Sequence, residues 1–94
     1  MKREVTTETG FHCEIDEEAL DDFELLEALA NMDAQGDGVK IISGFNKSME
    51  LLLGVEQKAQ LYEHIREQYG RVKMSALKTE LLQIFTGLSE DKKK

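Results

Sequence analysis

The sequence predicts a mainly α-helical domain: a compact bundle of about four helices with a short N-terminal β-hairpin or strand. Three observations support this fold class. Apolar residues recur at helical spacing over most of the chain after residue 16, and the residues before it alternate at a period of two. Glycine is the residue type that marks the ends of helices and strands in this chain, since the 94 residues include no proline. The length fits a single domain over 1–94, in which we expect 1–3 and 89–94 to be flexible.

Residues 4–15 are expected to be extended. Val5 and the threonines near it favour strands, a glycine permits a turn, and Phe11, Cys13 and Ile15 alternate with polar residues. An isolated hairpin is only marginally stable, so its apolar face should lie on the helices or on another subunit.

The first helix should begin after Asp16, a residue type that caps helix N-termini. Its apolar residues fall on two faces, and we expect that a domain of this size cannot bury both. The face that we assign to the core consists of Ala19, Phe23, Leu26 and Ala30. The second face consists of Leu25, Ala28, Leu29 and Met32. Residues 31–38 are then expected to form a loop.

Glycines predict the ends of the remaining helices. The second helix should run from about Val39 to Leu53 and end at Gly54 as a left-handed cap. The third should run from about Glu56 to Gln68 and end at Gly70. After an extended link over 71–73, the fourth should run from about Ser75 to Thr86, with Gly87 stopping it. Their expected core residues are Ile41, Ile42, Phe45, Met49, Leu52 and Leu53, then Ala59, Tyr62, Ile65 and Tyr69, then Leu77, Leu81, Ile84 and Phe85.

The charge of the chain is divided between two regions. From Glu4 to Asp37 there are twelve Asp or Glu residues and no Lys or Arg, whereas from Gly38 to Lys94 ten Lys or Arg outnumber seven acids. A net charge of −7 argues against nucleic acid as a partner. A charge distribution of this kind steers encounters with other proteins, and it also allows self-association between the acidic region of one copy and the basic region of another.

No residue pattern predicts an enzyme, a metal site or a cofactor. Cys13 is the only cysteine, which excludes an internal disulfide and favours a reducing compartment. His12, Cys13 and His64 are the soft ligand candidates, but neighbours on a strand point to opposite faces. The acids between Asp16 and Glu27 suggest a solvated helix face rather than a catalytic pair. No apolar stretch is long enough to cross a membrane, so we expect no membrane partner.

Four apolar residues lie off the expected core stripes: Leu25, Met32, Leu51 and Leu82. Together with the acidic border they suggest an apolar groove or seam rimmed by charge, the kind of surface that binds helices or self-associates. We therefore predict that these four residues bind a partner.

Two segments carry a resemblance to a known family. They are the run FHCEIDEEALDDFELLEALA from Phe11 to Ala30, and the run LLLGVEQKAQLYEHIR from Leu51 to Arg66 followed by Gly-Arg-Val at 70–72. In combination they resemble the short tail assembly chaperones of long-tailed phages and prophages of Gram-positive bacteria, over about residues 11–86. Lys73 stands where the resemblance leads us to expect proline.

The resemblance implies a mainly α-helical chaperone that binds and solubilises the tape measure protein. It also implies recruitment of tail tube protein through a longer, frameshifted form, and a location in the host cytoplasm rather than in the mature virion. The alternative is a small acidic regulatory or adaptor module that docks on a basic protein partner. Binding to such a partner should depend strongly on salt, whereas binding through an apolar seam should depend on it little.

Overall fold

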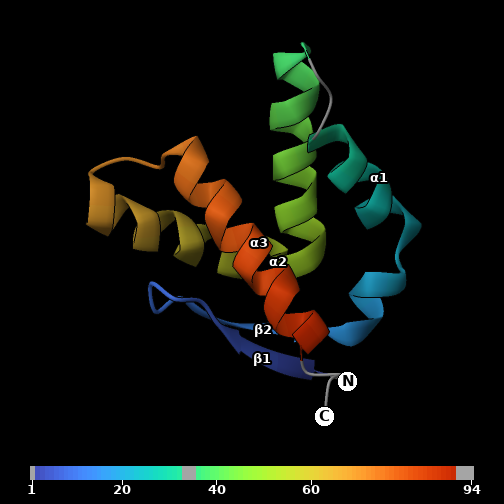
Figure 1. Ribbon diagram of the computed structural model, residues 1–94, viewed down its shortest axis with the longest axis horizontal. Coiled ribbons are helices and arrows are strands. Elements are labelled where there is room, and N and C mark those ends of the chain that lie inside the picture. Colours follow the sequence, from blue (N-terminus) through green and yellow to red (C-terminus); the bar gives the residue numbers. More distant parts are fainter. Residues whose placement is uncertain (1, 33–35, 91–94) are drawn as a thin grey trace.

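The computed structural model describes residues 2–32 and 36–90 of the chain. In this part, a two-stranded sheet is followed by a 3₁₀ helix and three α-helices (Figure 1). The elements in chain order are β1 (Lys2–Thr6), β2 (His12–Asp16), η1 (Glu17–Asp21), α1 (Phe23–Met32), α2 (Gly38–Tyr69) and α3 (Met74–Glu90). The mainly helical fold class with an N-terminal hairpin is confirmed, whereas the expected count of about four helices is wrong.

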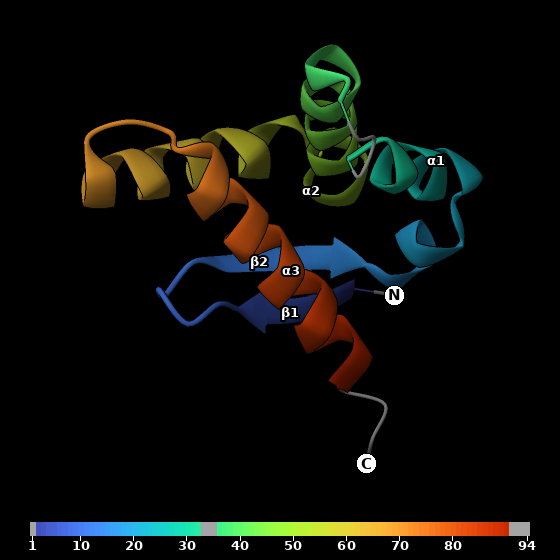
Figure 2. The ribbon, with the colours of Figure 1, turned by 45° about the horizontal axis from the view of Figure 1, so that its top comes forward.

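The hairpin is antiparallel, with Val5 paired to Cys13 and Arg3 paired to Ile15. Val5, Cys13 and Ile15 are buried and alternate with exposed residues, as the period of two predicted. α3 crosses the hairpin on this buried side (Figure 2). Lys2 and Arg3, which belong to the N-terminal residues expected to be flexible, lie in β1.

Arg3 ties the hairpin to two other elements. Its guanidinium donates to the Glu17 carboxylate of η1 and, over 2.5 Å, to the backbone carbonyl of Leu88 in α3. The guanidinium therefore joins the start of the chain to the last helix.

The expected first helix is divided at Asp22. Asp16 caps η1 as predicted: its carboxylate accepts from the Glu18 N–H over 3.0 Å, and this hydrogen bond lowers the pKa of Asp16. Asp22 has extended backbone angles, and its carboxylate accepts from the Glu24 N–H over 2.9 Å. Asp22 thus ends η1, and its side chain caps the N-terminus of α1.

α1 buries the opposite face from the one that we assigned to the core. Leu25 and Ala28 are buried and Met32 is half-buried, whereas Phe23 and Leu26 are exposed. The reason lies in α2, where a Cβ on Gly44 would be 2.7 Å from the Ala28 carbonyl oxygen. The missing side chain lets the two helices approach, and their contact selects the face that carries Ala28.

α2 contains a kink where two separate helices were expected. Gly54 has φ 83° and ψ 166°, a combination open almost only to glycine. The expected break is therefore present, but Gly54 is not the left-handed cap that was predicted, and the helix resumes directly after it. Gly70, with φ 80° and ψ −4°, is a left-handed cap as expected.

A glutamine side chain supports the kink. Gln57 donates to the Leu53 carbonyl over 2.9 Å and to the Glu14 carbonyl over 2.8 Å, and it accepts from the Glu14 N–H over 2.7 Å. It therefore bonds to both backbone groups of a residue at the edge of β2, and holds α2 against the sheet. Figures 1 and 2 show the two segments of α2 running in clearly different directions.

Gly87 does not stop the last helix, contrary to the prediction. α3 continues to Glu90, and a Cβ on Gly87 would lie 2.9 Å from Cγ1 of Val5. The glycine therefore serves a close approach between helix and strand rather than a helix end. The rest of the expected flexible tail, residues 91–94, lies outside the described residues.

Candidate functional site

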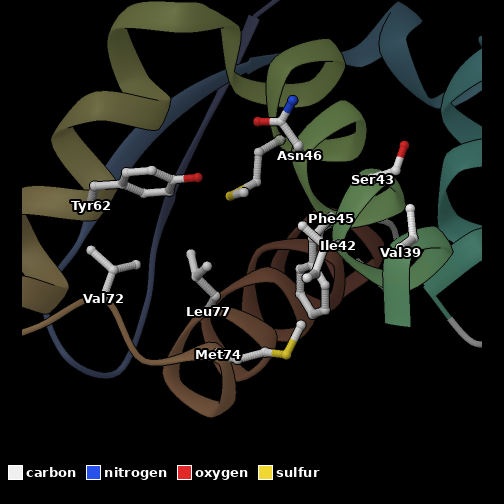
Figure 3. Close-up of a pocket in the computed structure, with 10 residues that line it drawn as sticks. Val39, Ile42, Ser43, Phe45, Asn46, Tyr62, Val72, Met74 and Leu77 are labelled. Carbon is white, nitrogen blue, oxygen red and sulfur yellow. The ribbon is translucent and has the colours of Figure 1, made fainter. Parts of the chain in front are cut away.

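An apolar groove lies between the two segments of α2 and the start of α3. Its volume is about 640 Å³. Figure 3 shows side chains from all three directions facing it: Ile42 and Phe45 on the first segment of α2, Tyr62 on the second, and Met74 and Leu77 on α3. The kink at Gly54 creates this arrangement, because it turns the second half of α2 away from the first.

The groove has a buried floor and an exposed rim. Phe45, Met49 and Leu77 are buried at the floor, whereas Val39 is 79% exposed and Ile42 is 62% exposed. Single exposed apolar residues are ordinary on a protein surface. Several of them around a concave apolar floor are typical of a surface that binds another chain.

Polar groups fix the edge of the groove near the kink. Lys58 donates to Glu50 over 3.0 Å and also donates to the Asn46 side chain, so it links the two segments of α2. Its Nζ lies 5.7 Å from the centre of the Tyr62 ring. These contacts hold Asn46 and Tyr62 in place on opposite walls.

Three basic residues are sequence neighbours of residues that line the groove. Lys40 follows Val39 in α2, and Arg71 and Lys73 flank Val72, which lines the groove in the link before α3. Within residues 2–32 and 36–90, none of the three cations forms an ion pair.

The nearby acids, in contrast, are engaged. Glu50 pairs with Lys58, and Glu63 pairs with Arg66 over 2.5 Å. The carboxylate of Asp37 caps α2 by accepting from the Lys40 N–H. Among the three cations, Lys73 has an aromatic partner, since its Nζ lies 5.1 Å from the centre of the Tyr69 ring.

The structure does not bring the four predicted partner-binding residues together. Leu25 is fully buried on α1, so its assignment to a position off the core is wrong. Met32 and Leu51 are half-buried and pack against the core, and only Leu82, at 57%, is as exposed as expected. None of the four lines the groove between the segments of α2. Leu82 lies beside a separate hollow between α3 and the turn that follows β1.

The apolar surplus that the sequence predicted lies on α1 in other residues. Phe23 is 73% exposed, Leu26 is 53% exposed, and Ala30 is exposed on the same face. Because the two apolar faces of this helix are of similar size, periodicity alone could not show which face is buried. Gly44 was the available signal, because glycine inside a helix indicates a close approach.

Cys13 and His64, two of the soft ligand candidates, contact different groups. The Cys13 side chain is buried, and burial, reinforced by the nearby Glu80 carboxylate, raises the pKa of the thiol to about 11. A thiol with this pKa is almost entirely protonated near neutral pH and is a poor nucleophile. The His64 ring contacts Phe11, with 5.6 Å between the ring centres. Among the residues that the structure places, no three His, Cys, Asp or Glu side chains are arranged to hold a metal ion.

A hydrogen-bond network joins the turn of the hairpin to α2 and α3. The Thr9 hydroxyl donates to Oε2 of Glu80 over 2.6 Å and lies 2.9 Å from Nε2 of His64. A hydroxyl has one proton to give, so His64 is the donor in the second contact. Glu80 is buried, and its other oxygen, Oε1, has no hydrogen-bond partner in the described part of the chain. Sequence reasoning missed this buried acid.

Comparisons with protein-family models, curated proteins and solved structures find no match to this chain. Over the residues placed by the structure, no helix is sufficiently long and apolar to cross a membrane.

Proposed function

We propose that the chain is a phage tail assembly chaperone that binds and solubilises the tape measure protein. Two observations support the proposal. Residues 11–30, 51–66 and 70–72 resemble short tail assembly chaperones, and the structure has an apolar groove with exposed rim residues. The groove is the observation that carries the proposal, because a chaperone of apolar helices needs an apolar surface open to them.

The groove can receive one apolar face of a client helix. The client would cover Val39 and Ile42 on the rim and contact Phe45 at the floor. Burial of a large aliphatic side chain contributes about 1.5–3 kcal/mol relative to leaving it exposed. A few rim residues therefore supply enough free energy for a reversible complex, and the acidic surface of η1 and α1 remains outside to keep that complex dispersed.

Co-expression with the tape measure protein of the same phage genome tests the proposal. The tape measure protein should be soluble with the wild-type chain and largely insoluble without it. Ile42→Glu places a charge in the groove and should abolish the effect. Val55→Glu is the matched control, because Val55 is an exposed apolar residue of the same helix that lies outside the groove. Equal solubility of the tape measure protein with and without the chain would contradict the proposal.

The proposal extends to later assembly. A longer frameshifted form would carry an additional domain that recruits tail tube protein, in the host cytoplasm and not in the finished virion. Detection of a fusion product in infected cells by mass spectrometry tests this part separately.

The exposed acids of α1 favour a second candidate, an adaptor module that docks on a basic partner. Glu24 and Glu27 are exposed and make no ion pair in the described part of the chain. Such a complex should weaken steeply as salt rises, because exposed charges are screened. Binding through the groove should change little with salt.

A further inference from the structure

The pairing of the hairpin shows which backbone groups lie on its outer edges. Both backbone groups of Glu14 bond to the Gln57 side chain, so they point away from β1. Residues along an antiparallel pair bond alternately inward and outward, so Glu4, the partner of Glu14, points away from β2. Lys2 and Thr6 share the orientation of Glu4, because each lies two residues from it. The N–H and C=O groups of these three residues therefore form the outer edge of β1.

The outer edge of β1 is open. In the described part of the chain, no hydrogen bond reaches the backbone groups of Lys2, Glu4 or Thr6 from outside the hairpin. Past the end of the strand, the Glu8 N–H donates to the Gln83 side chain of α3 over 2.7 Å. Figure 2 shows β1 on the side of the sheet away from α2. An unpaired strand edge of this kind is a template for another extended chain.

A hollow of about 440 Å³ adjoins the Thr6 end of this edge. Thr6 and Glu8 line it from the hairpin, and the exposed Leu82, together with Gln83 and Thr86, lines it from α3. A strand added to β1 turns alternate side chains toward α3. The hollow can therefore receive one side chain of the added strand, which would also cover Leu82.

The charges on the solvent face of the hairpin indicate which chain can pair with this edge. Glu4 and Glu14 are exposed and lie directly opposite each other. Glu4 lies 3.4 Å from His12 but, among the side chains that the structure describes, pairs with no Lys or Arg. A second copy of β1, aligned antiparallel over its full length, would place its own Glu4 opposite this one, and like charges directly opposite destabilise a sheet. A basic residue at the same position would form a favourable pair instead.

We propose that the outer edge of β1 binds an extended segment of a different protein that carries a lysine or arginine opposite Glu4. The backbone of this segment pairs with Lys2, Glu4 and Thr6, and its apolar side chains point toward the hollow beside Leu82. Backbone hydrogen bonds supply the affinity, and the charge pair with Glu4 sets the register. The edge and the groove share no lining residue, so this inference goes beyond the proposed function and does not depend on it.

Titration with the acetylated and amidated peptide TVKVT tests the proposal by amide NMR. The peptide sequence is symmetric, so its lysine can lie opposite Glu4 in either chain direction. In the free protein, the N–H groups of Glu4 and Thr6 should exchange rapidly with water, whereas those of Arg3 and Val5, which point toward β2, should be protected. At millimolar peptide, the Glu4 and Thr6 signals should shift, and their exchange should slow at least ~3-fold.

Two control peptides and one variant separate backbone pairing from charge. TVEVT should bind at least ~3-fold more weakly than TVKVT, because it places like charges together. Methylation of the lysine backbone nitrogen in TVKVT should abolish binding, because it removes a donor to the strand edge. In Glu4→Lys the preference should reverse in favour of TVEVT; Glu4 is exposed, so the variant should fold, with circular dichroism as the check.

The proposal is wrong if the Glu4 and Thr6 signals stay unchanged at millimolar TVKVT, if TVKVT and TVEVT bind equally, or if Glu4→Lys keeps the wild-type preference. Ile42→Glu, which alters the groove, should bind TVKVT like the wild type. The proposed chaperone role is measured with the tape measure protein and survives any of these results.

Discussion

Gly87 of α3 and Val5 of β1 approach each other so closely that a methyl group on the glycine would lie 2.9 Å from Cγ1 of the valine. This contact allows α3 to pack directly against β1 of the hairpin. The Arg3 guanidinium donates to the Leu88 carbonyl one residue further along α3, so polar and apolar contacts fix the same junction.

Gly87→Ala tests the junction. Alanine favours a helix over glycine by about 1 kcal/mol, but the buried Val5 is held in a paired strand and cannot move away freely. Overpacking costs about 1–3 kcal/mol, so the free energy of unfolding should fall by a net amount of about 0–2 kcal/mol in urea denaturation. In a Val5→Ala background, Gly87→Ala should instead be neutral or stabilising. Stabilisation in the wild-type background would refute the close contact.

Gly54→Ala tests the kink that shapes the groove. Its backbone conformation, φ 83° and ψ 166°, is strained for any residue with a Cβ, so the variant should lose about 1–3 kcal/mol of stability. Gly38→Ala is the control, since an added Cβ at the start of the same helix meets no atom within 4 Å and Gly38 has no positive φ. Equal thermal stability of the two variants would count against a glycine-dependent kink.

Thr9→Val tests the network around Glu80. The change removes the 2.6 Å hydrogen bond to Oε2 and leaves the buried carboxylate with neither oxygen bonded. Loss of a partner from a buried polar group costs about 1–3 kcal/mol, and more when the group is charged. In a Glu80→Leu background the same change should cost far less. If Thr9→Val lowers stability as much in the Glu80→Leu background as in the wild type, the hydrogen bond to Glu80 is not the cause of the loss.

Cys13 should make stability depend on alkaline pH. Burial and Glu80 raise the pKa of the folded-state thiol from 9.0 to about 11, so the unfolded chain loses this proton first. The contribution of the protonated thiol to the free energy of unfolding is therefore fully present below pH 9, and it declines as pH rises toward about 11. The difference in unfolding free energy between wild type and Cys13→Ala should shrink over this interval. A constant difference would exclude a raised thiol pKa.

The sequence predicted the features that depend on neighbours along the chain. The alternation of Val5, Cys13 and Ile15, the cap at Asp16 and the left-handed Gly70 are all present as expected. Each follows from local backbone chemistry, which a single sequence displays directly.

The errors arose where a distant contact decides between local alternatives. α1 has two apolar faces, and contact with Gly44 of α2 determines which one is buried. Gly87 was interpreted as a helix end, whereas its role comes from Val5, far away in sequence. The groove depends on how α2 turns at Gly54, so Val39, Ile42 and Met74 could not be grouped by periodicity.

Methyl NMR on titration with a soluble segment of the tape measure protein tests the central claim most directly. If the groove receives client helices, the methyl signals of Val39, Ile42 and Met74 should shift, and those of the equally apolar and exposed Val55 should not. The claim is contradicted if the segment binds while all three groove signals stay unchanged.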